Sequence, residues 1–329
     1  MQRTLTPALL AVMCIALFGF GTFFLNYSTL VSIGTNMGLT AVAAGTILTI
    51  MMVAVVAVQP LAPVLNTHFG PRMTFFAALS LQAAGNLLSL LTHFPLFALV
   101  SGSVVGGLGF GILVVIGTAA VPSTVAPERL GKALGYFGVT TSGATAIGAP
   151  AGLWLINIMP AIGFRWLAFG FILLALPALL AIPQQHQTSN TASPDVGQPV
   201  DGRMRWGGLI TVLLPVSIVL TTFGLLLAFG PAAHSVSPAL YIVSMQIFAI
   251  IGRFLASSSL DRRSPVSVMS AGIVVTLIGL IFTALLPAGT ALIIAMMVLG
   301  FGIGAVQASS LLLCFEQSGS TNRGSVAWN

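Results

Sequence analysis

The feature that most constrains this chain is the placement of its charged residues. Thr4–Pro71 is a run of 68 residues without Asp, Glu, Lys or Arg. Three further charge-free runs cover 73–127 (55 residues), 206–252 (47 residues) and 264–315 (52 residues). A membrane-crossing helix needs about 20 apolar residues, so each run has room for two crossings. Fifteen of the sixteen charged residues lie between these pairs of crossings, and the exception is Arg165.

The composition indicates the same environment. Hydrophobic residues make up 57% of the chain and charged residues 5%, and the mean hydropathy is +1.07. A water-soluble fold of 329 residues cannot bury that much apolar surface, so lipid must solvate it. The net charge of +6 therefore indicates orientation in the bilayer and contact with anionic headgroups, and we expect no nucleic-acid partner.

Breaks at Gly, Pro, Asn and charged clusters divide the chain into ten expected spans, which makes an all-α polytopic membrane bundle. The spans are 7–33, 39–64, 73–92, 95–120, 131–158, 163–182, 207–230, 236–260, 266–286 and 289–315. With the N-terminus inside, ten basic residues lie on the cytoplasmic side and only Arg165 lies outside. This bias follows the positive-inside rule, so we expect a multi-pass protein with a cytoplasmic N-terminus.

An internal repeat indicates two halves. Three short motifs recur at an offset of 193 or 194 residues: Gly107–Gly111 with Gly300–Gly304, Gly131 with Gly324, and 69–71 with 263–265. Parallel repeats of this kind are an architecture of membrane transporters. The polar stretch 183–205 reads as a flexible cytoplasmic linker. We expect a six-helix half at 1–182, the linker at 183–205, and a second half at 206–329.

The same offset predicts that the second half is incomplete. The counterpart of Ile182 would stand at position 375, beyond Asn329. The second half is therefore expected to hold about four helices and the start of a fifth, with two final spans missing.

A motif lies between the second and third spans, where 63–72 reads Pro-Val-Leu-Asn-Thr-His-Phe-Gly-Pro-Arg. It resembles the Gly-x-Leu-Ala-Asp-Arg-x-Gly-Arg-Arg/Lys loop of the major facilitator superfamily, with Gly70 and Arg72 at the matching glycine and final basic residue. Thr67 stands where the family has an acid. The second copy, 260–264, keeps the acid and the arginine as Asp261 and Arg262 but lacks the glycines.

The resemblance implies that these loops form a cytoplasmic gate. In the family, such charges latch the two halves together, and here Asp261 and Arg262 would contact the start of the fifth span near Arg129. The alternative is that they are only orientation signals. Arg253 lies inside an apolar span, where it should either snorkel or pair with Asp261 or Glu316.

Glycine and proline patterns indicate close helix contacts. The clusters at 106–111 and 300–304 resemble phosphate loops, but neither is followed by Lys-Ser/Thr, and missing side chains let helices approach. The stretch Gly148–Gly152 is similar to a Gly-Pro pattern in helix five of facilitator-type exporters, although Ala149 interrupts it. Together with 127–131, it resembles bacterial arabinose-efflux-like permeases, which implies efflux across a bacterial inner membrane.

Polar residues within the spans are the candidates for substrate binding. They are Asn26, Tyr27, Thr140, Thr222, Gln246 and Gln307. The resemblance favours Asn26, Thr222 and Gln307, because helices one, four, seven and ten line the path in the family. For each residue the competing interpretation is an interhelical hydrogen bond.

We therefore expect a monomeric secondary transporter that moves a small drug-like or sugar-like solute by alternating access between its halves. No paired carboxylates, metal cluster or activated nucleophile lies in any span, so we predict no enzyme, no metal and no cofactor. No Asp or Glu lies near the middle of any of the ten expected spans, so the sequence gives no support for proton coupling. The alternative is a non-transporting fragment or a membrane sensor built on a carrier fold.

Overall fold

The computed structural model describes residues 5–91, 95–126, 130–183, 238–259, 263–286 and 289–317. All regular structure in these ranges is helical. The chain divides into two compact units, the first formed mainly by 1–186 and the second mainly by 187–226 and 244–329.

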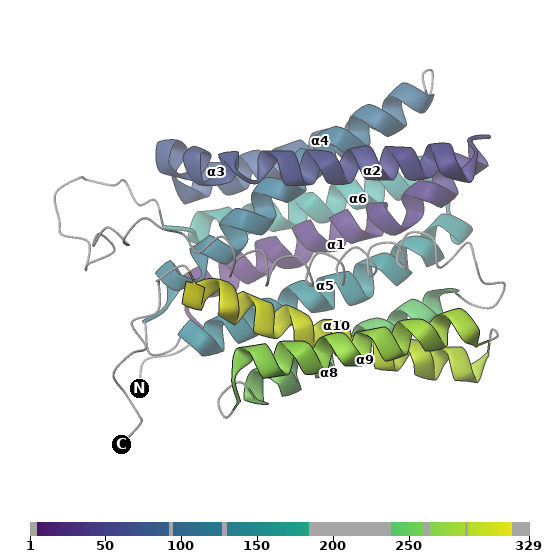
Figure 1. The fold of residues 1–329 in the computed structure, drawn as a ribbon. Helices are drawn as coiled ribbons and strands as arrows, with labels where there is room; N and C mark the ends of the chain where they lie inside the picture. Colours follow the sequence, from purple (N-terminus) through teal and green to yellow (C-terminus); the bar gives the residue numbers. More distant parts are fainter. Residues whose placement is uncertain are drawn as a thin grey trace. The chain divides into compact units, whose positions relative to one another are not determined.

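The helices of the first unit run roughly along one direction (Figure 1). They are α1 (Pro7–Asn36), α2 (Ala41–Val58), α3 (Leu61–Leu88), α4 (Pro95–Ala120), α5 (Leu130–Ile158) and α6 (Ala161–Ala175), with short 3₁₀ turns η1 (Pro122–Thr124) and η3 (Leu176–Ala181). The remaining helices are α8 (Pro238–Ser259), α9 (Pro265–Leu285) and α10 (Thr290–Gln317), and residues 244–259 of α8 belong to the second unit with α9 and α10.

Side-chain caps define several helix starts. The hydroxyl oxygen of Thr6 accepts a hydrogen bond from the backbone N–H of Leu9 at 3.1 Å, and Pro7 occupies the first helical position. Thr40 caps α2 and Ser264 caps α9 in the same way, at 3.2 and 3.3 Å. Because such caps satisfy backbone N–H groups that have no partner within the helix, they fix where each helix begins.

The connection between the second and third predicted spans is more helical than expected. The sequence places a loop at about 65–72, but helix continues from Leu61 through residue 69 and the break is confined to Gly70. Gly70 has φ of 78° and ψ of 165°, a conformation that residues with a Cβ rarely adopt. Pro71 then begins the second helical part of α3. The end of the expected second span at residue 64 is therefore wrong.

The predicted spans agree well with the described helices. Nine of the ten coincide with a helix, and the seventh, 207–230, lies outside the described residues. Within the described part, six helices are long and apolar enough to cross a membrane: Pro7–Asn36, Ala41–Val58, Leu96–Ala120, Ala161–Ala181, Pro265–Leu285 and Thr290–Ser310. The all-helical membrane fold is confirmed.

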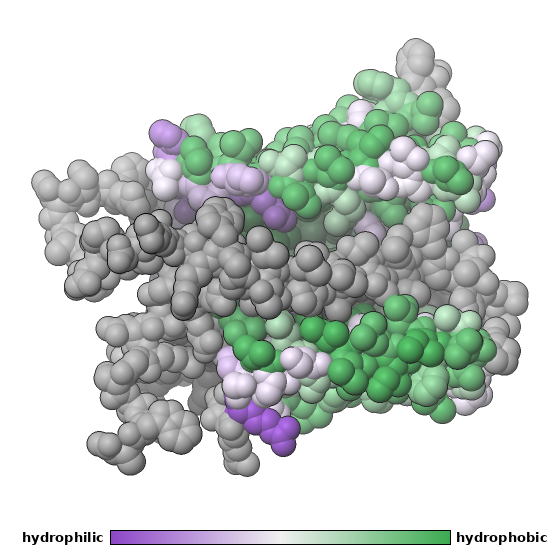
Figure 2. All heavy atoms as spheres, in the orientation of Figure 1, coloured by the Kyte–Doolittle hydropathy of each residue, from purple (hydrophilic) through white to green (hydrophobic). Residues whose placement is uncertain are grey.

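Large apolar side chains cover much of the surface. Exposed examples are Val42, Trp154, Leu180, Phe254 and Leu285. Figure 2 shows hydrophobic residues over most of the coloured surface of each unit. Soluble monomers rarely expose contiguous apolar patches larger than a few hundred Å², so this surface is suited to lipid.

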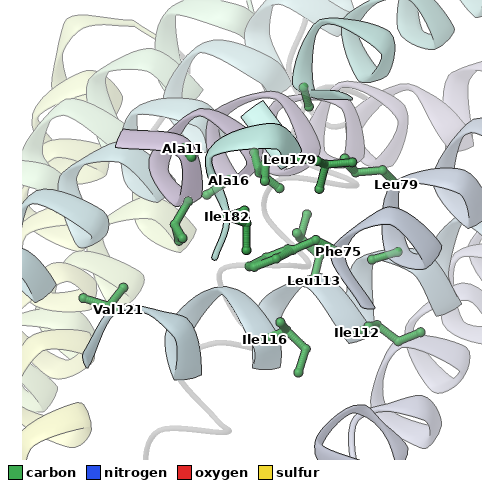
Figure 3. Packing of buried hydrophobic residues seen from close by; sticks show 14 of the residues in the cluster. Ala11, Ala16, Phe75, Leu79, Ile112, Leu113, Ile116, Val121, Leu179 and Ile182 are labelled. Atoms are coloured by element: carbon green, nitrogen blue, oxygen red, sulfur yellow. The ribbon is translucent and has the colours of Figure 1, made fainter. Parts of the chain in front are cut away.

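One end of the first unit is packed with apolar side chains. Phe75 lies among Leu113, Leu179 and Ile182 (Figure 3), and Phe75 and Leu113 are completely buried. Further members come from the first half of α1, the last half of α4 and the start of α5. These segments meet because α1 and the second part of α3 begin at this end, where α4 finishes. The cluster fills this end of the unit with side chains.

The glycines of α4 allow unusually close helix contacts, as the sequence predicts. A Cβ added to Gly107 or Gly111 would lie 2.8 or 2.3 Å from the carbonyl oxygens of Met51 and Val55 in α2. A Cβ on Gly109, which faces α3, would lie 2.5 Å from the carbonyl oxygen of Ala78. Real Cβ atoms do not approach so closely, so these helices touch backbone to backbone.

The second unit repeats these contacts. A Cβ on Gly300 would lie 1.9 Å from the carbonyl oxygen of Met245, and one on Gly304 would lie 2.0 Å from that of Ala249. Gly302 packs against Thr276 of α9. Each glycine stands 193 positions after its α4 counterpart, and both carbonyls stand 194 positions after those of Met51 and Val55. The two copies of the repeat therefore share helix contacts as well as residue types.

Gly111→Ala is expected to lower the stability of the protein by about 1–3 kcal/mol, because α2 and α4 must separate to admit the methyl group. The matched control is Gly106→Ala in the same helix, where an added Cβ meets nothing within 4 Å. That substitution should be neutral, or stabilising by up to about 1 kcal/mol, since alanine is the better helix former. Thermal unfolding of the detergent-solubilised protein measures both, and equal melting temperatures would contradict the backbone contact.

Candidate functional site

Arg165 is a charged residue inside the first unit. It is the fifth residue of α6, and only 7% of its surface is exposed. The helical repeat places Arg165 on the same face as Ala168, Ile172 and Ala175, all of them buried, whereas Trp166 points outward. Arg165 is therefore held inside by the apolar face of its own helix.

Polar side chains from three helices connect to this arginine. Arg165 Nη1 donates to Oδ1 of Asn26 in α1 at 2.5 Å. Asn26 Nδ2 donates to Oδ1 of Asn86 in α3 at 3.2 Å and to the carbonyl oxygen of Thr22 at 2.9 Å. Asn86 Nδ2 donates to the carbonyl oxygen of Gln82 at 3.0 Å. The network joins α1, α3 and α6 through amide groups.

A small cavity of about 30 Å³ adjoins the network. Its lining consists of Phe23, Asn26, Leu30, Met51, Gln82, Gly85, Asn86, Ser89, Gly102, Ser103, Gly106 and Arg165. Gln82 is 3% exposed, and its Nε2 has no hydrogen-bond partner among the described residues. A polar cavity of this size holds about two water molecules. It therefore offers hydrogen-bond donors in excess of the acceptors that the described residues supply.

A larger pocket of about 330 Å³ lies beside the first, where α1, α3 and α5 end and α4 and α6 begin. Its lining is Ile33, Asn36, Met37, Ser89, Leu90, Leu91, Ala98, Leu99, Ile156, Ala161, Ile162 and Arg165. Most of these side chains are apolar. Arg165 and Ser89 line both cavities, so this arginine lies where the wide pocket adjoins the narrow cavity that Asn26, Gln82 and Asn86 also line.

The described partners of Arg165 carry no charge. Arginine stays protonated in proteins, so this is a buried cation. Its described neighbours are the Asn26 oxygen and the ring of Phe164, 5.7 Å from Cζ. An ionisable residue inside a membrane bundle is expensive to keep there, so Arg165 is a candidate for a functional site.

Of the predicted binding residues in the first unit, the structure places Asn26 in this site. Tyr27 is buried and packs instead against Phe23 and Phe24, with ring centroids 5.9 and 6.2 Å apart. The hydroxyl of Thr140 donates to the carbonyl oxygen of Tyr136 in its own helix at 2.9 Å. Tyr27 and Thr140 do not line either cavity described above.

Predicted binding residues also occur in the second unit. Gln246 of α8 is 3% exposed, and its Nε2 has no partner among the described residues. Gln307 of α10 accepts a hydrogen bond from Nη2 of Arg253. The partners that the sequence suggests for Arg253, namely Asp261 and Glu316, have side chains outside the described part of the structure. Thr222 lies outside the described residues.

The predicted gate is described only in part. Gly70 forms the positive-φ break in α3, and Arg72 follows it, half-buried. Arg253 contacts Gln307, and its backbone N would lie 2.8 Å from a Cβ on Gly304. The other three gate residues, Arg129, Asp261 and Arg262, lie outside the described residues.

Five polar residues of the small cavity were not predicted from the sequence: Gln82, Asn86, Ser89, Ser103 and Arg165. Two signals were present. Arg165 is the exception to the charge rhythm, and Gln82 and Asn86 stand four residues apart in an otherwise apolar span, on one helical face. The expected helix began at 163, which left Arg165 at the outer edge; the helix begins at Ala161 and its inward face carries the arginine into the unit.

The comparisons with known proteins agree with this architecture. The sequence profile described as Major Facilitator Superfamily matches residues 11–327, which is nearly the whole chain. The chain belongs to the major facilitator superfamily. The family that the gate motif suggests, a superfamily of membrane transporters, is thereby confirmed.

Solved structures of the superfamily share the fold. A partially occluded, inward-open structure of the xylose transporter XylE from E. coli aligns with a TM-score of 0.72 at 13% identity, covering 95% of this chain and 85% of that one. The human organic anion transporter MFSD10 (TETRAN) aligns with a TM-score of 0.65 at 14% identity, covering 93% and 85%. A D-xylose-proton symporter aligns with a TM-score of 0.65 at 14% identity, covering 92% of this chain and 80% of that one. The superfamily and its fold identify a multi-pass secondary transporter.

Asn26→Ala is expected to destabilise the native protein more than it destabilises an Arg165→Met background. The excess should be about 1.5–3 kcal/mol, the value of a hydrogen bond to a charged group, because removal of Asn26 leaves the buried guanidinium without its described acceptor. Thermal or denaturant unfolding of the four proteins in this double-mutant cycle measures the coupling. Asn157→Ala is the control, since Asn157 bonds only within α5, to Leu153; additive losses for Asn26 and Arg165 would contradict the network.

Proposed function

We propose that this chain moves a small organic solute, drug-like or sugar-like, out of a bacterial cell across the cytoplasmic membrane. It works as a monomer with a cytoplasmic N-terminus, and two helical halves at 1–182 and 206–329 rock about the linker 183–205. The outward direction rests on the resemblance of Gly148–Gly152 to helix five of exporters. That stretch packs tightly on α1, where a Cβ on Gly152 would lie 2.5 Å from the carbonyl oxygen of Leu25.

The observation that carries the proposal is the pair of adjoining cavities in the first unit. Ligand pockets of proteins measure about 300–1,000 Å³ and combine apolar walls with a few polar groups. The pocket of about 330 Å³ meets this description, with Asn36, Ser89 and Arg165 as its polar residues. Superfamily membership adds the means of moving a bound solute, since alternating access exposes such a site to each side of the membrane in turn.

In this proposal, candidate residues for substrate binding occur in each half. Asn26 serves the first half, because it borders the smaller cavity and orients Arg165. Gln246 serves the second, where a buried amide lacking a described partner has hydrogen bonds to offer a ligand. Thr222 and Gln307 remain candidates from the sequence, with Gln307 also holding Arg253. Tyr27 and Thr140 are weaker candidates, given their contacts within the protein.

The gate of this transporter is formed by Gly70, Arg72, Arg129, Arg253, Asp261 and Arg262. The turn at Gly70 supports it, because only a residue without a Cβ readily adopts φ of 78°, and the turn presents Arg72 at the start of a helix. The Arg253–Gln307 hydrogen bond supports it too, since it ties α8 to α10 near the loop that carries Asp261.

Transport is tested with the 329-residue chain reconstituted in proteoliposomes. The panel contains labelled sugars and amphipathic drugs, and flux is compared with that of empty vesicles in both orientations of the protein. We expect one class of solute to move down its gradient, faster in the direction that corresponds to efflux. Asn26→Ala should reduce that flux about tenfold or more and Asn157→Ala should not, because the loss of one hydrogen bond to a buried charge is worth at least a factor of ten.

Absence of flux for every solute, with the protein folded and monodisperse, would contradict the proposal. It would favour the alternative of a sensor or non-transporting fragment. Equal flux in Asn26→Ala would leave transport standing but remove the first-unit cavity from the substrate path.

Asp261→Asn is expected to shift the conformational balance toward the inward-open state, because it removes the acid from the gate. Cysteines introduced on the cytoplasmic and outer sides report the shift through their rates of labelling by a membrane-impermeant maleimide. Arg263→Gln, which removes an exposed charge two positions away, is the control. Unchanged labelling on both sides would contradict the gating role.

A further inference from the structure

We propose that the solute is an organic anion, and that its carboxylate binds Arg165 while its apolar body occupies the pocket of about 330 Å³. The inference rests on the proposed transport function and names its substrate class. The sequence alone suggests a drug-like or sugar-like solute and does not specify its charge. The arrangement around Arg165 selects among these.

The first reason is charge. Only 7% of the Arg165 surface is exposed, and its described partners, the amide oxygen of Asn26 and the ring of Phe164, are both neutral. A buried cation is stabilised when an anion shares its low-dielectric surroundings, and it is costly when nothing does. A neutral sugar would leave this charge uncompensated, whereas a carboxylate would neutralise it. The site therefore discriminates in favour of anions.

The second reason is the supply of hydrogen-bond donors. A guanidinium group has five N–H donors, and the described residues accept from it once, through Asn26 Oδ1. Gln82 lines the same small cavity, and its buried Nε2 is another donor without a described partner. A carboxylate offers only acceptors and can receive two parallel bonds from one arginine. The unused N–H donors of Arg165 and Gln82 thus match the acceptor oxygens of a carboxylate ligand.

The third reason is the shape of the space. The wide pocket is walled mainly by Ile33, Leu90, Leu99, Ile156 and Ile162, and Arg165 lies where it adjoins the narrow cavity that contains the amides of Asn26, Gln82 and Asn86. Its walls come from α1, α3, α4, α5 and α6, so the whole pocket belongs to one unit. A ligand with one charged end and a compact apolar body fits this division. Aromatic and short-chain aliphatic carboxylates have this form.

Binding is tested separately from transport, on the purified chain in a neutral maltoside detergent. Benzoate is the probe, and benzamide, with the same ring and no charge, is its matched control. Benzoate should raise the melting temperature in a saturable way and benzamide should not. In Arg165→Met the benzoate affinity should fall about 10- to 100-fold, as expected for the loss of a charge-assisted hydrogen bond.

Two further variants keep the test decisive. Arg165→Lys retains the charge without the bidentate geometry, so it should bind benzoate with intermediate affinity even if Arg165→Met folds poorly. Arg263→Gln removes one exposed positive charge elsewhere, and its benzoate affinity should match that of the unaltered protein. Equal responses to benzoate and benzamide, or an unchanged benzoate affinity in both Arg165 variants, would overturn the inference.

A lipid headgroup also carries an anionic group. If phosphatidylglycerol stabilises the protein through Arg165 and benzoate neither stabilises it nor competes, the site binds lipid and the inference is wrong. Labelled benzoate flux in proteoliposomes separates the remaining possibilities. Binding that depends on Arg165 without flux of any solute would support the anion site and defeat the proposed function; flux of neutral solutes alone, unaffected by Arg165→Lys, would support transport and defeat the anion site.

Discussion

The hydrogen bond between Arg165 and Asn26 is the interaction on which the interior of the first unit depends. A guanidinium group inside a lipid-solvated bundle must find an acceptor, and Asn26 supplies one at 2.5 Å. Asn86 orients Asn26 by a hydrogen bond, so residues of α1 and α3 together stabilise the charged side chain of α6. One cation thereby specifies the mutual register of three helices that apolar packing alone would leave less defined.

The two ends of the first unit consequently differ in character. Around Phe75 and Leu113 the helices are filled with apolar side chains, which leaves little room for a ligand. Toward the opposite end the polar network and the two cavities replace this packing. One end of the unit is thus tightly packed and the other contains cavities. This division suits one helical half of a transporter, because the packed end can move as a rigid body while the cavities provide room for a solute.

The helices were predictable from the sequence because lipid imposes a strong and local rule on them, and the close contacts of Gly107–Gly111 followed from the absence of side chains. The site was predictable only through Asn26. Whether Arg165 is a loop charge or a buried one depends on a two-residue shift in the start of α6 and on which face turns inward. Hydropathy averages over faces, so it cannot decide such a question. Similarly, the sequence predicts a loop near Gly70, but only the backbone conformation shows that the break is confined to this residue.

The repeat explains which parts of the structure are scaffold and which are specific. Its contacts recur with their spacing, from Gly111 on Val55 to Gly304 on Ala249. The polar groups do not recur. At the same offset of 194, Gln82 corresponds to Thr276, Asn86 to Leu280 and Arg253 to Gln59. Each unit thus has its own arginine within a helix, the buried Arg165 in α6 and the half-buried Arg253 in α8, at positions that the repeat does not relate. A duplicated scaffold with unduplicated charges can present different chemistry from its two halves.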